Sequence, residues 1–442
     1  MLSPLAFSVP LLLAGLQATA VGASPSISAV GSKFFYENGT QFYIKGIAYQ
    51  LTPSDPLIDT AQCKRDIARM SELGTNAIRV YHVDPHADHE GCMSALADAG
   101  IHLFVDLDTF NTQIEQTQFD HFKEVLDEFQ KFDNTAGVFV GNEVLTTANG
   151  STAAPYVLAA ARDIKAYRNQ KGYREIPVGY SAADIADLRP MLQNYMACSK
   201  DPSERLDFYS LNAYEWCGVS SYEQSGYNIL QKNATDYPIP IFFSETGCNT
   251  PSPRTFEDQA AIFGDHMSDT WSGSMVYEWI EETNDYGLIS YGPSVDAATA
   301  TASSIEDGFT RKGTPTPVSP DFDNLKSQWA TLHPTGVALS IYKKSATSVA
   351  AIECPASTSG GWAVDPSSPL PTLGQTFKQG TDSTATSKDS KGSKVTSKGS
   401  PSASATKEGA AQAMTVGSPA TERLLAGSLV LSGLLGAVAI WL

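Results

Sequence analysis

Two glutamates end apolar stretches of the sequence that are typical of buried strands. The stretch GVFVGNEVLT covers residues 137–146 and is broken by Asn142 and Glu143, while IPIFFSE ends at Glu245. Cleavage of a glycosidic bond requires two carboxyl groups, because one protonates the leaving oxygen and the other attacks the sugar or activates water. An amide beside the acid, such as that of Asn142, can hydrogen-bond a hydroxyl of the reacting sugar. These residues therefore predict a site that cleaves glycosides.

Position alone does not single out this pair, because strands often end in polar residues. Other carboxyl groups near expected strand ends belong to Asp106, Asp108, Glu278, Glu281 and Glu282. Glu143 and Glu245 can be chosen from these acids only once the strands that position them have been predicted.

Short apolar runs alternate with segments of helical periodicity from residue 40 onward, which indicates repeated strand-helix units and a parallel sheet. Eight strands are expected, and their ends lie near Gln50, Tyr81, Asp106, Glu143, Tyr180, Tyr214, Glu245 and Tyr277. A doubly wound open sheet would need a Gly-rich phosphate loop after the first strand, and GIAYQLTPSD contains none. We therefore predict an α/β fold, a (β/α)8 TIM barrel, whose active site lies at the carboxyl ends of the strands. Glu143 and Glu245 lie three units apart, so their strands face each other across the barrel mouth.

Both ends of the chain have the composition of targeting segments. Residues 1–23 contain the apolar run PLAFSVPLLLAGL followed by small residues, which predicts a signal peptide cut after Ala20 or Ala23. Residues 409–442 combine small residues, a polar spacer and an uncharged apolar tail, the pattern of a glycolipid (GPI) anchor signal. The attachment residue is expected between Gly409 and Ala413, and the alternative is a true tail anchor. Residues 24–355 are then the catalytic domain, and residues 356–408, rich in Ser, Thr and Lys, a disordered and solvated stalk.

Charge and cysteine content narrow the class of protein further. Residues 1–355 carry 23 Lys and Arg against 43 Asp and Glu, which disfavours nucleic acid and polyanionic substrates and fits a neutral polymer such as a glucan. Six Cys in a secreted chain predict three disulfides, with fifteen possible connectivities. Sequons at Asn38, Asn149 and Asn233 are candidate N-glycosylation sites.

The stretch YHVDPHADHE, residues 81–90, gathers histidines and carboxylates and raises the question of a metal site. Its spacing matches no standard zinc signature, and polar residues are ordinary in such a loop. We expect no metal and no other cofactor.

Several motifs together resemble glycoside hydrolase family 72, the fungal β-1,3-glucanosyltransferases that a glycolipid anchors at the cell surface. The motifs are KGIAYQ, NAIRVY, CMSALADAGIHLFVDLD, GNEV, DFYSLNAYEWCG, FFSETGC and MVYEWIEETNDYGL, and the resemblance covers roughly residues 27–355. It implies a retaining mechanism with Glu143 as general acid/base and Glu245 as nucleophile. It also assigns further residues to the subsite of the reacting sugar, namely Tyr81, Asn142, Tyr214, Tyr277, Gln50 and Asp106. Ring packing at the barrel rim is the alternative for Tyr81 and Tyr277.

The resemblance also implies the disulfide pairs Cys63–Cys92, Cys198–Cys354 and Cys217–Cys248. All six Cys precede the expected stalk, which is typical of the shorter subgroup that lacks a cysteine-rich carbohydrate-binding module.

The implied reaction cleaves a β-1,3-glucan internally and transfers the donor segment to the non-reducing end of another β-1,3-glucan, elongating the glucan of the cell wall. The protein would act as a monomer at the outer leaflet of the plasma membrane, held by the GPI anchor, or in the wall. Two alternatives stay open: a retaining endo-β-1,3-glucanase, which would use the same carboxyl pair, and a non-catalytic glucan-binding protein of the wall.

Overall fold

A computed structural model describes residues 24–51, 55–107, 116–345, 352–359, 361–375 and 377 of the 442-residue chain. The expected signal peptide, residues 1–23, and the expected anchor signal, residues 409–442, lie outside the described residues, as does Asp108. No helix of the described residues is long and apolar enough to cross a membrane.

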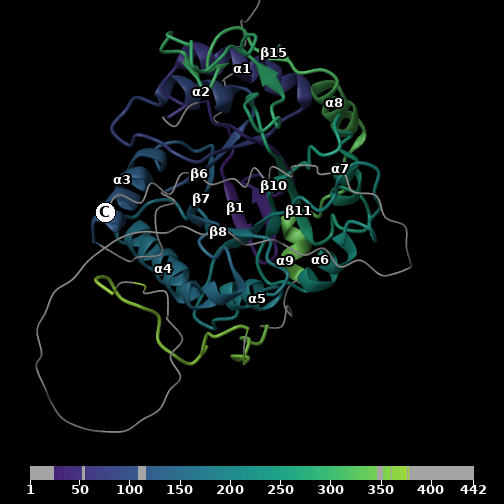
Figure 1. Ribbon diagram of the computed structural model, residues 1–442. Helices are drawn as coiled ribbons and strands as arrows, with labels where there is room; N and C mark the ends of the chain where they lie inside the picture. Colours follow the sequence, from purple (N-terminus) through teal and green to yellow (C-terminus); the bar gives the residue numbers. More distant parts are fainter. Residues whose placement is uncertain are drawn as a thin grey trace, which may run out of the picture. The chain divides into compact units, whose positions relative to one another are not determined.

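Eight parallel strands close into a barrel, which confirms the predicted fold (Figure 1). In chain order they are β4 (Ile44–Ala48), β5 (Ala77–Val80), β6 (His102–Asp106), β7 (Thr135–Asn142), β8 (Val178–Ala183), β9 (Phe208–Asn212), β10 (Ile241–Thr246) and β11 (Trp271–Val276). Each strand pairs with its neighbour in sequence, and β11 pairs with β4 to close the ring. Polar residues at the carboxyl ends of these strands therefore meet at one end of the barrel.

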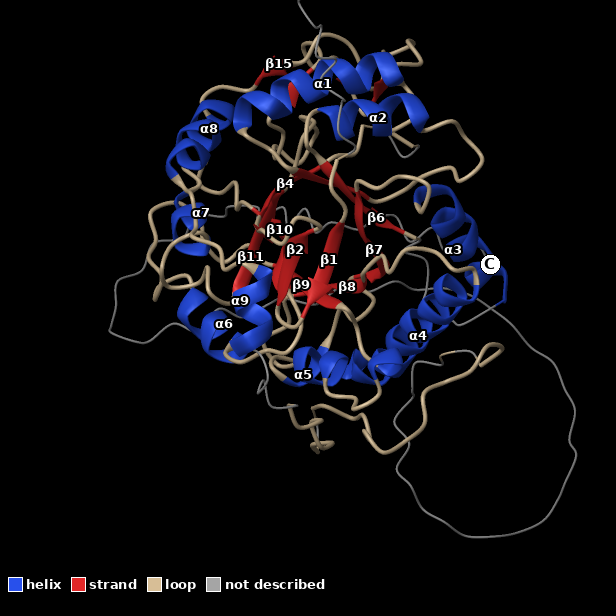
Figure 2. Cartoon of the chain, turned by 180° about the vertical axis from the view of Figure 1, so that it is seen from behind, coloured by secondary structure: helices blue, strands red, loops and turns tan. Residues whose placement is uncertain are grey.

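Helices follow the strands and surround the barrel (Figure 2). They are α1 (Thr60–Leu73), α2 (Glu90–Asp98), α3 (Gln116–Phe129), α4 (Ala154–Gln170), α5 (Met191–Ala197), α6 (Tyr227–Ala234), α7 (Glu257–Ile262) and α8 (Asp321–Thr331). The residues that begin and end a helix are clearest in α1. The Asp59 carboxylate accepts from the Gln62 backbone N–H at 2.9 Å, and Gly74 ends the helix at φ +77°, a conformation that favours glycine.

Alternate residues of each strand face the barrel interior or the helices. On β6, Leu103 and Val105 belong to the large core between strands and helices, whereas Phe104 belongs to a separate cluster. That second cluster contains phenylalanines from three other barrel strands and also Phe34, which precedes the first barrel strand in the chain.

Phe34 belongs to an antiparallel sheet that the sequence analysis did not predict. This sheet consists of β1 (Ile27–Val30), β2 (Lys33–Tyr36) and β3 (Gln41–Phe42). The Phe34 ring lies 6.0 Å from that of Phe104 and 5.8 Å from that of Phe208, measured between ring centroids. The sheet therefore supplies apolar side chains to the barrel interior, away from the strand ends that carry the site.

Shorter elements complete the described chain. They are the 3-10 helices η1 (Ala148–Ala153) and η2 (Pro202–Glu204), the strands β12 (Ile289–Ser290), β13 (Ile305–Glu306), β14 (Phe309–Thr310) and β15 (Thr316–Pro317), and the helix α9 (Leu339–Ser345). The four strands form two small antiparallel ladders between β11 and α8.

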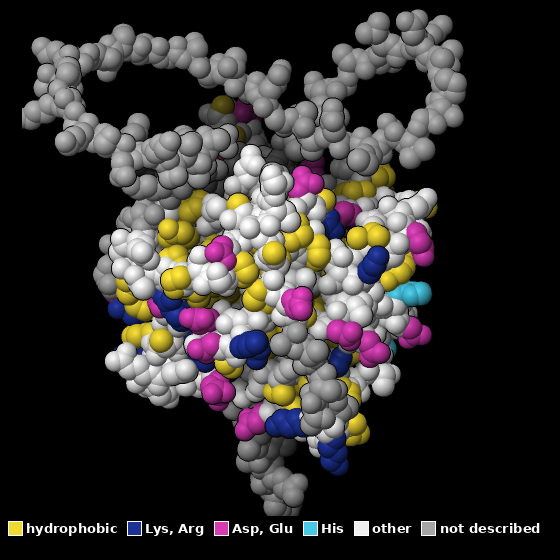
Figure 3. All heavy atoms as spheres, turned by 90° about the horizontal axis from the view of Figure 1, so that it is seen from below, with side chains coloured by type: hydrophobic (Ala, Val, Ile, Leu, Met, Phe, Trp, Pro, Cys, Tyr) yellow, Lys and Arg dark blue, Asp and Glu magenta, His cyan; other side chains and the backbone are white. Residues whose placement is uncertain are grey.

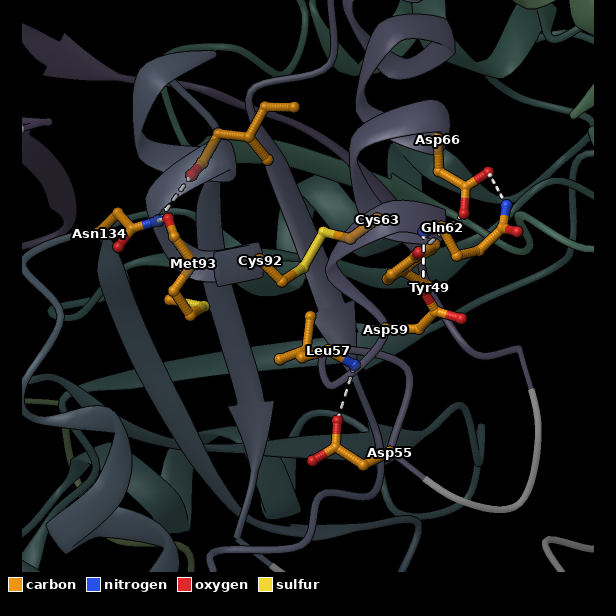
Figure 4. Close-up of a disulfide and its surroundings, with 11 residues drawn as sticks. Tyr49, Asp55, Leu57, Asp59, Gln62, Cys63, Asp66, Cys92, Met93 and Asn134 are labelled. Atoms are coloured by element: carbon orange, nitrogen blue, oxygen red, sulfur yellow. Dashed lines mark hydrogen bonds between the residues drawn. A yellow bond between two sulfur atoms is a disulfide. The ribbon is translucent and has the colours of Figure 1, made fainter. Parts of the chain in front are cut away.

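Three disulfides join Cys63 to Cys92, Cys198 to Cys354 and Cys217 to Cys248. These are the pairs that the family resemblance implies. Figure 4 shows the first of them linking α1 to α2, which follow neighbouring strands of the barrel.

The packed domain extends beyond the predicted boundary at residue 355, which corrects the expected start of the stalk. Trp362 is fully buried, and its ring lies 5.4 Å from that of Tyr195 on α5. Further along, Arg162 on α4 donates to the Pro371 carbonyl at 2.7 Å. The Ser- and Thr-rich composition misled the prediction, because the buried Trp362 and the hydrogen bonds of Ala363 and Pro371 hold this segment on the barrel. Residues 378–408 of the expected stalk lie outside the described residues.

Acidic, basic and apolar side chains are interspersed on the face that Figure 3 shows. Of the three sequons, Asn38 and Asn149 are exposed and Asn233 is half-buried at the end of α6.

Candidate active site

Glu245 lies near the carboxyl end of β10 and is only 3% exposed. Two tyrosine hydroxyls hold its carboxylate: Tyr81 donates to Oε1 and Tyr214 donates to Oε2, each at 2.9 Å. These donors come from the loops after β5 and β9, so three strands of the barrel contribute to the orientation of one carboxylate. Such fixation is what an attacking carboxylate needs, because it removes the freedom to rotate away from the sugar.

Glu143 directly follows β7, and its backbone adopts φ +49°. This left-handed conformation is uncommon for a residue with a side chain and is found preferentially at functional sites. The backbone N–H of Glu143 donates to the Ser181 carbonyl at 2.8 Å, which holds the turn against β8. Glu143 is half-buried, whereas Glu245 is almost wholly enclosed.

Asn212, the last residue of β9, orients both the acid and its neighbouring amide. Its Nδ2 donates to Glu143 Oε1 at 2.9 Å and to Asn142 Oδ1 at 3.1 Å. The orientation of the Asn212 amide is fixed in turn, because Ser181 and Ser244 donate to its Oδ1 at 2.9 and 2.8 Å.

Arg79 on β5 connects the two halves of the site. It is fully buried and makes two hydrogen bonds to Asp106, of 3.0 and 2.8 Å. It also donates to Asn142 Oδ1 at 3.0 Å and approaches Glu245 Oε1 to 3.4 Å. A continuous chain of contacts therefore runs from Glu143 through Asn212, Asn142 and Arg79 to Glu245. Asp106, which the resemblance assigns to the sugar subsite, is 1% exposed and directs both carboxylate oxygens at Arg79.

Some neighbours of Glu245 raise the pKa of its carboxyl and others lower it. Burial raises the pKa of its carboxyl to about 7, although the Arg79 guanidinium opposes this shift; the charge of Glu143 adds to it, and the hydrogen bonds from Tyr214 and Tyr81 favour the ionised form. A carboxyl perturbed in this way by burial and by a second carboxyl is typical of a catalytic site.

Tyr277 and Gln50 lie at the adjoining strand ends. Gln50 Nε2 contacts the Tyr277 hydroxyl at 3.0 Å and Glu278 Oε2 at 2.7 Å. The Tyr277 ring lies 6.5 Å from that of Tyr214 and 5.4 Å from that of Tyr286. The structure thus brings together all the residues that the sequence and the resemblance place at the site: Glu143, Glu245, Tyr81, Asn142, Tyr214, Tyr277, Gln50 and Asp106.

Sequence reasoning missed Arg79, Asn212 and Glu278 as members of the site. Arg79 carried a signal, because it is a charged residue inside the apolar run AIRVY, where burial requires a charged partner. Glu278 was noted only as one of several acids near a strand end.

The histidine-rich stretch has a structural explanation. His89 is fully buried and lies between Asp55, 2.6 Å from its Nε2, and Glu128, 3.1 Å from its Nδ1. Asp55 also accepts from the backbone N–H groups of Leu57, drawn in Figure 4, and Asp84. Within the described ranges, no group of three or more His, Cys, Asp or Glu is arranged to hold a metal ion.

Comparison with known proteins matches residues 16–307 to the family model of the glucanosyltransferases of glycoside hydrolase family 72. Protein EPD1 of Candida maltosa is 42% identical over 349 residues, which cover 76% of this chain and 59% of that protein. A 1,3-beta-glucanosyltransferase of Arthroderma benhamiae is 39% identical and aligns with 74% of this chain and 60% of its own length. The chain thus spans about three fifths of the length of these relatives.

The fold is also similar to that of Saccharomyces cerevisiae Gas2p, solved as a mutant in complex with laminaritetraose and laminaripentaose. The identity is 38% and the TM-score 0.69, with 78% of this chain and 74% of the Gas2p chain covered.

Proposed function

Because the chain belongs to glycoside hydrolase family 72, the glucanosyltransferases, we propose that it cleaves β-1,3-glucan and transfers the donor segment to the non-reducing end of a second β-1,3-glucan. One observation carries this proposal: Glu143 and Glu245 lie at the carboxyl end of the barrel and are joined by a continuous chain of polar contacts. The oligosaccharides bound to Gas2p are laminari-oligosaccharides, which supports a glucan of the same kind as the substrate here.

In the first step Glu245 attacks the anomeric carbon of the donor while the bond to the leaving glucan breaks. Glu143 gives its proton to the leaving oxygen, so the departing chain leaves with a free reducing end. The donor remains bound to Glu245 as a glycosyl ester. Tyr81 and Tyr214 orient the carboxylate for this attack, because each hydroxyl holds one of its oxygens.

In the second step a hydroxyl of the acceptor glucan loses its proton to Glu143 and attacks the same anomeric carbon, which releases Glu245. Two inversions restore the original anomeric configuration. A water molecule would use the same residues to hydrolyse the ester, so the affinity of the site for the acceptor decides whether transfer prevails.

The experiment is product analysis by mass spectrometry after incubation with a reduced laminari-oligosaccharide of defined length. We expect products longer than the substrate with the wild-type protein, and none with Glu143→Gln or Glu245→Gln. Glu37→Gln, at an exposed glutamate in the turn between β2 and β3, is the matched control and should behave as wild type. Shorter products alone would make the protein a retaining endo-β-1,3-glucanase, and glucan binding without turnover would make it a wall-binding protein.

We also infer that the protein acts at the cell surface, where its substrate would be. The signal-like N-terminus and anchor-like C-terminus support secretion followed by GPI attachment near residues 409–413. Release of the protein from intact cells by a phosphatidylinositol-specific phospholipase C tests the anchor, and retention in the membrane after treatment would contradict it.

A further inference from the structure

Glu278 is a fully buried carboxyl group beside the site, and the proposed mechanism does not use it. It follows Tyr277 at the carboxyl end of β11. Each of its oxygens accepts from a side-chain amide: Gln50 Nε2 donates to Oε2 and Asn284 Nδ2 donates to Oε1, both at 2.7 Å. The Asn284 amide is itself oriented, because its Oδ1 accepts from the Tyr286 backbone N–H at 3.1 Å.

These contacts determine which way the Gln50 amide is turned. An ionised carboxylate can only accept hydrogen bonds, so the nitrogen of Gln50, rather than its oxygen, must face Glu278. The same nitrogen lies 3.0 Å from the Tyr277 hydroxyl. Its two hydrogens therefore serve Glu278 and Tyr277, and the Tyr277 oxygen is an acceptor in this contact.

The hydrogen of the Tyr277 hydroxyl must then point elsewhere. Among the described residues, the Tyr277 hydroxyl donates no hydrogen bond. The side chain is 1% exposed, so bulk water competes little for that hydrogen. Tyr277 packs beside Tyr214, whose own hydroxyl is bonded to Glu245, which places it on the side of the reacting carboxyl.

We propose that Glu278 is a positioning residue whose ionised carboxylate sets the direction of the hydrogen-bond chain through Gln50 and thereby makes Tyr277 a donor to the sugar held at Glu245. This inference rests on the proposed function. A hydroxyl that donates to a sugar oxygen discriminates in favour of a ligand with an acceptor at that position, because an unpaired buried polar group is costly.

The direction of the chain depends on the proton of Glu278. If Glu278 is protonated, it can donate to Gln50, the amide can turn over, and Tyr277 can donate to Gln50 instead of to the sugar. Burial raises the pKa of Glu278 to about 8 and the charges of Glu282 and Glu245 add to this, while the amides of Asn284 and Gln50 favour the ionised form. The donor role of Tyr277 is therefore strongest above this pH and declines below it.

A double-mutant cycle between positions 278 and 277 tests the proposal. We would measure kcat and KM for a laminari-oligosaccharide with the wild type, Glu278→Gln, Tyr277→Phe and the double variant, at one pH above and one well below the pKa of Glu278. Loss of one donor to the sugar corresponds to roughly a tenfold loss of kcat/KM. At the higher pH we expect each single variant to lose about this factor and the double variant to be no worse than Tyr277→Phe. Losses that multiply in the double variant at both pH values would overturn the proposal.

An exchanged pair separates direction from packing. In Gln50→Glu/Glu278→Gln the carboxylate and the amide trade places, so the contacts and the net charge are kept but the carboxylate now accepts from Tyr277. We expect this variant to stay as impaired as Tyr277→Phe, whereas recovery of wild-type kcat/KM would show that only packing matters. If the wild type has no turnover, the proposed function fails, and calorimetric affinities of the same variants for laminaripentaose still decide the role of Glu278.

Discussion

The guanidinium of Arg79 lies 3.4 Å from the carboxylate of Glu245, and both groups are buried at the carboxyl end of the barrel. Arg79 cannot be regarded as a simple counter-ion of Glu245, because its contacts with Asp106, with the Asn142 amide and with the Ser181 hydroxyl are all shorter. The planar guanidinium, with its fixed donors, holds these partners in one arrangement. The ammonium group of a lysine would offer only a point charge.

We therefore predict that Arg79→Lys lowers kcat/KM at least about 100-fold, because one ammonium cannot replace the bidentate contact with Asp106 and also hold Asn142. Unfolding in denaturant should show destabilisation of about 3 kcal/mol or more, since buried polar partners lose their donor. The matched control is Arg69→Lys on α1, an exposed arginine paired with Glu72, which should change stability by less than about 1 kcal/mol. Wild-type kinetics in Arg79→Lys would contradict the linking role.

The raised pKa of Glu245 predicts an effect of pH on stability. Below the ordinary glutamate value of 4.5 the carboxyl is protonated in both folded and unfolded chains, so it contributes nothing. As the pH rises toward about 7 the unfolded chain ionises more readily, and the folded state loses stability; above that pH the loss is complete. Glu245→Gln should be inactive. Its stability advantage over wild type should grow as the pH rises from 4 to 8 and reach up to about 3 kcal/mol.

Chemical unfolding of wild type and Glu245→Gln at both pH values measures this gain, with Glu37→Gln as the exposed control. The same carboxyl predicts that kcat/KM falls as the pH drops below about 7, because Glu245 must be ionised in the free enzyme to act as the proposed nucleophile. A stability difference that does not change with pH would contradict the raised pKa.

Titration of His89 should also lower stability as the pH rises, but here the loss is that of a stabilising charge. Burial lowers its pKa, but the hydrogen bonds and charges of Asp55 and Glu128 outweigh burial and raise it above 6.5. A raised histidine pKa contributes stability that is fully present below the unfolded value and is lost as the pH rises through the folded one. Wild type should therefore lose stability at alkaline pH through this group.

The variant His89→Gln should remove this pH dependence and cost about 1.5–3 kcal/mol at pH 5.5, since a hydrogen bond to a charged group is lost. Melting temperatures between pH 5.5 and pH 9 report the change. His86→Gln in the same loop is the control, because its side chain is 75% exposed. Equal pH profiles for His89→Gln and wild type would rule out this titration.

The sequence predicted the barrel because each strand is a short apolar run with a polar end, as at Glu143 and Glu245. The same signal placed both carboxyls at the barrel mouth without any three-dimensional information. The sequence did not predict the N-terminal sheet, since its role depends on Phe34 meeting phenylalanines from strands far apart in the chain.

The partners of Arg79 and Asn212 could not be predicted for a related reason, although the charge of Arg79 in an apolar run signals that it needs one. A strand interior shows only the alternation of its side chains, and which buried polar groups meet across a barrel depends on register around the whole ring. Arg79 contacts partners on four other strands: Asp106 on β6, Asn142 on β7, Ser181 on β8 and Glu245 on β10. No local pattern encodes such a set.

The corrected domain boundary leads to the last prediction. Trp362 is fully buried against Tyr195, and the chain on either side of it is held by Cys354 and by the contact of Arg162 with the Pro371 carbonyl. Replacement of a buried tryptophan by alanine removes a large apolar surface and leaves a cavity, so Trp362→Ala should cost about 3–5 kcal/mol. Denaturant unfolding measures this loss. Leu373→Ala is the control from the same segment, because Leu373 is 39% exposed. If residues beyond 355 were only a solvated stalk, both variants would unfold like wild type; a selective loss in Trp362→Ala would instead make this segment part of the catalytic domain.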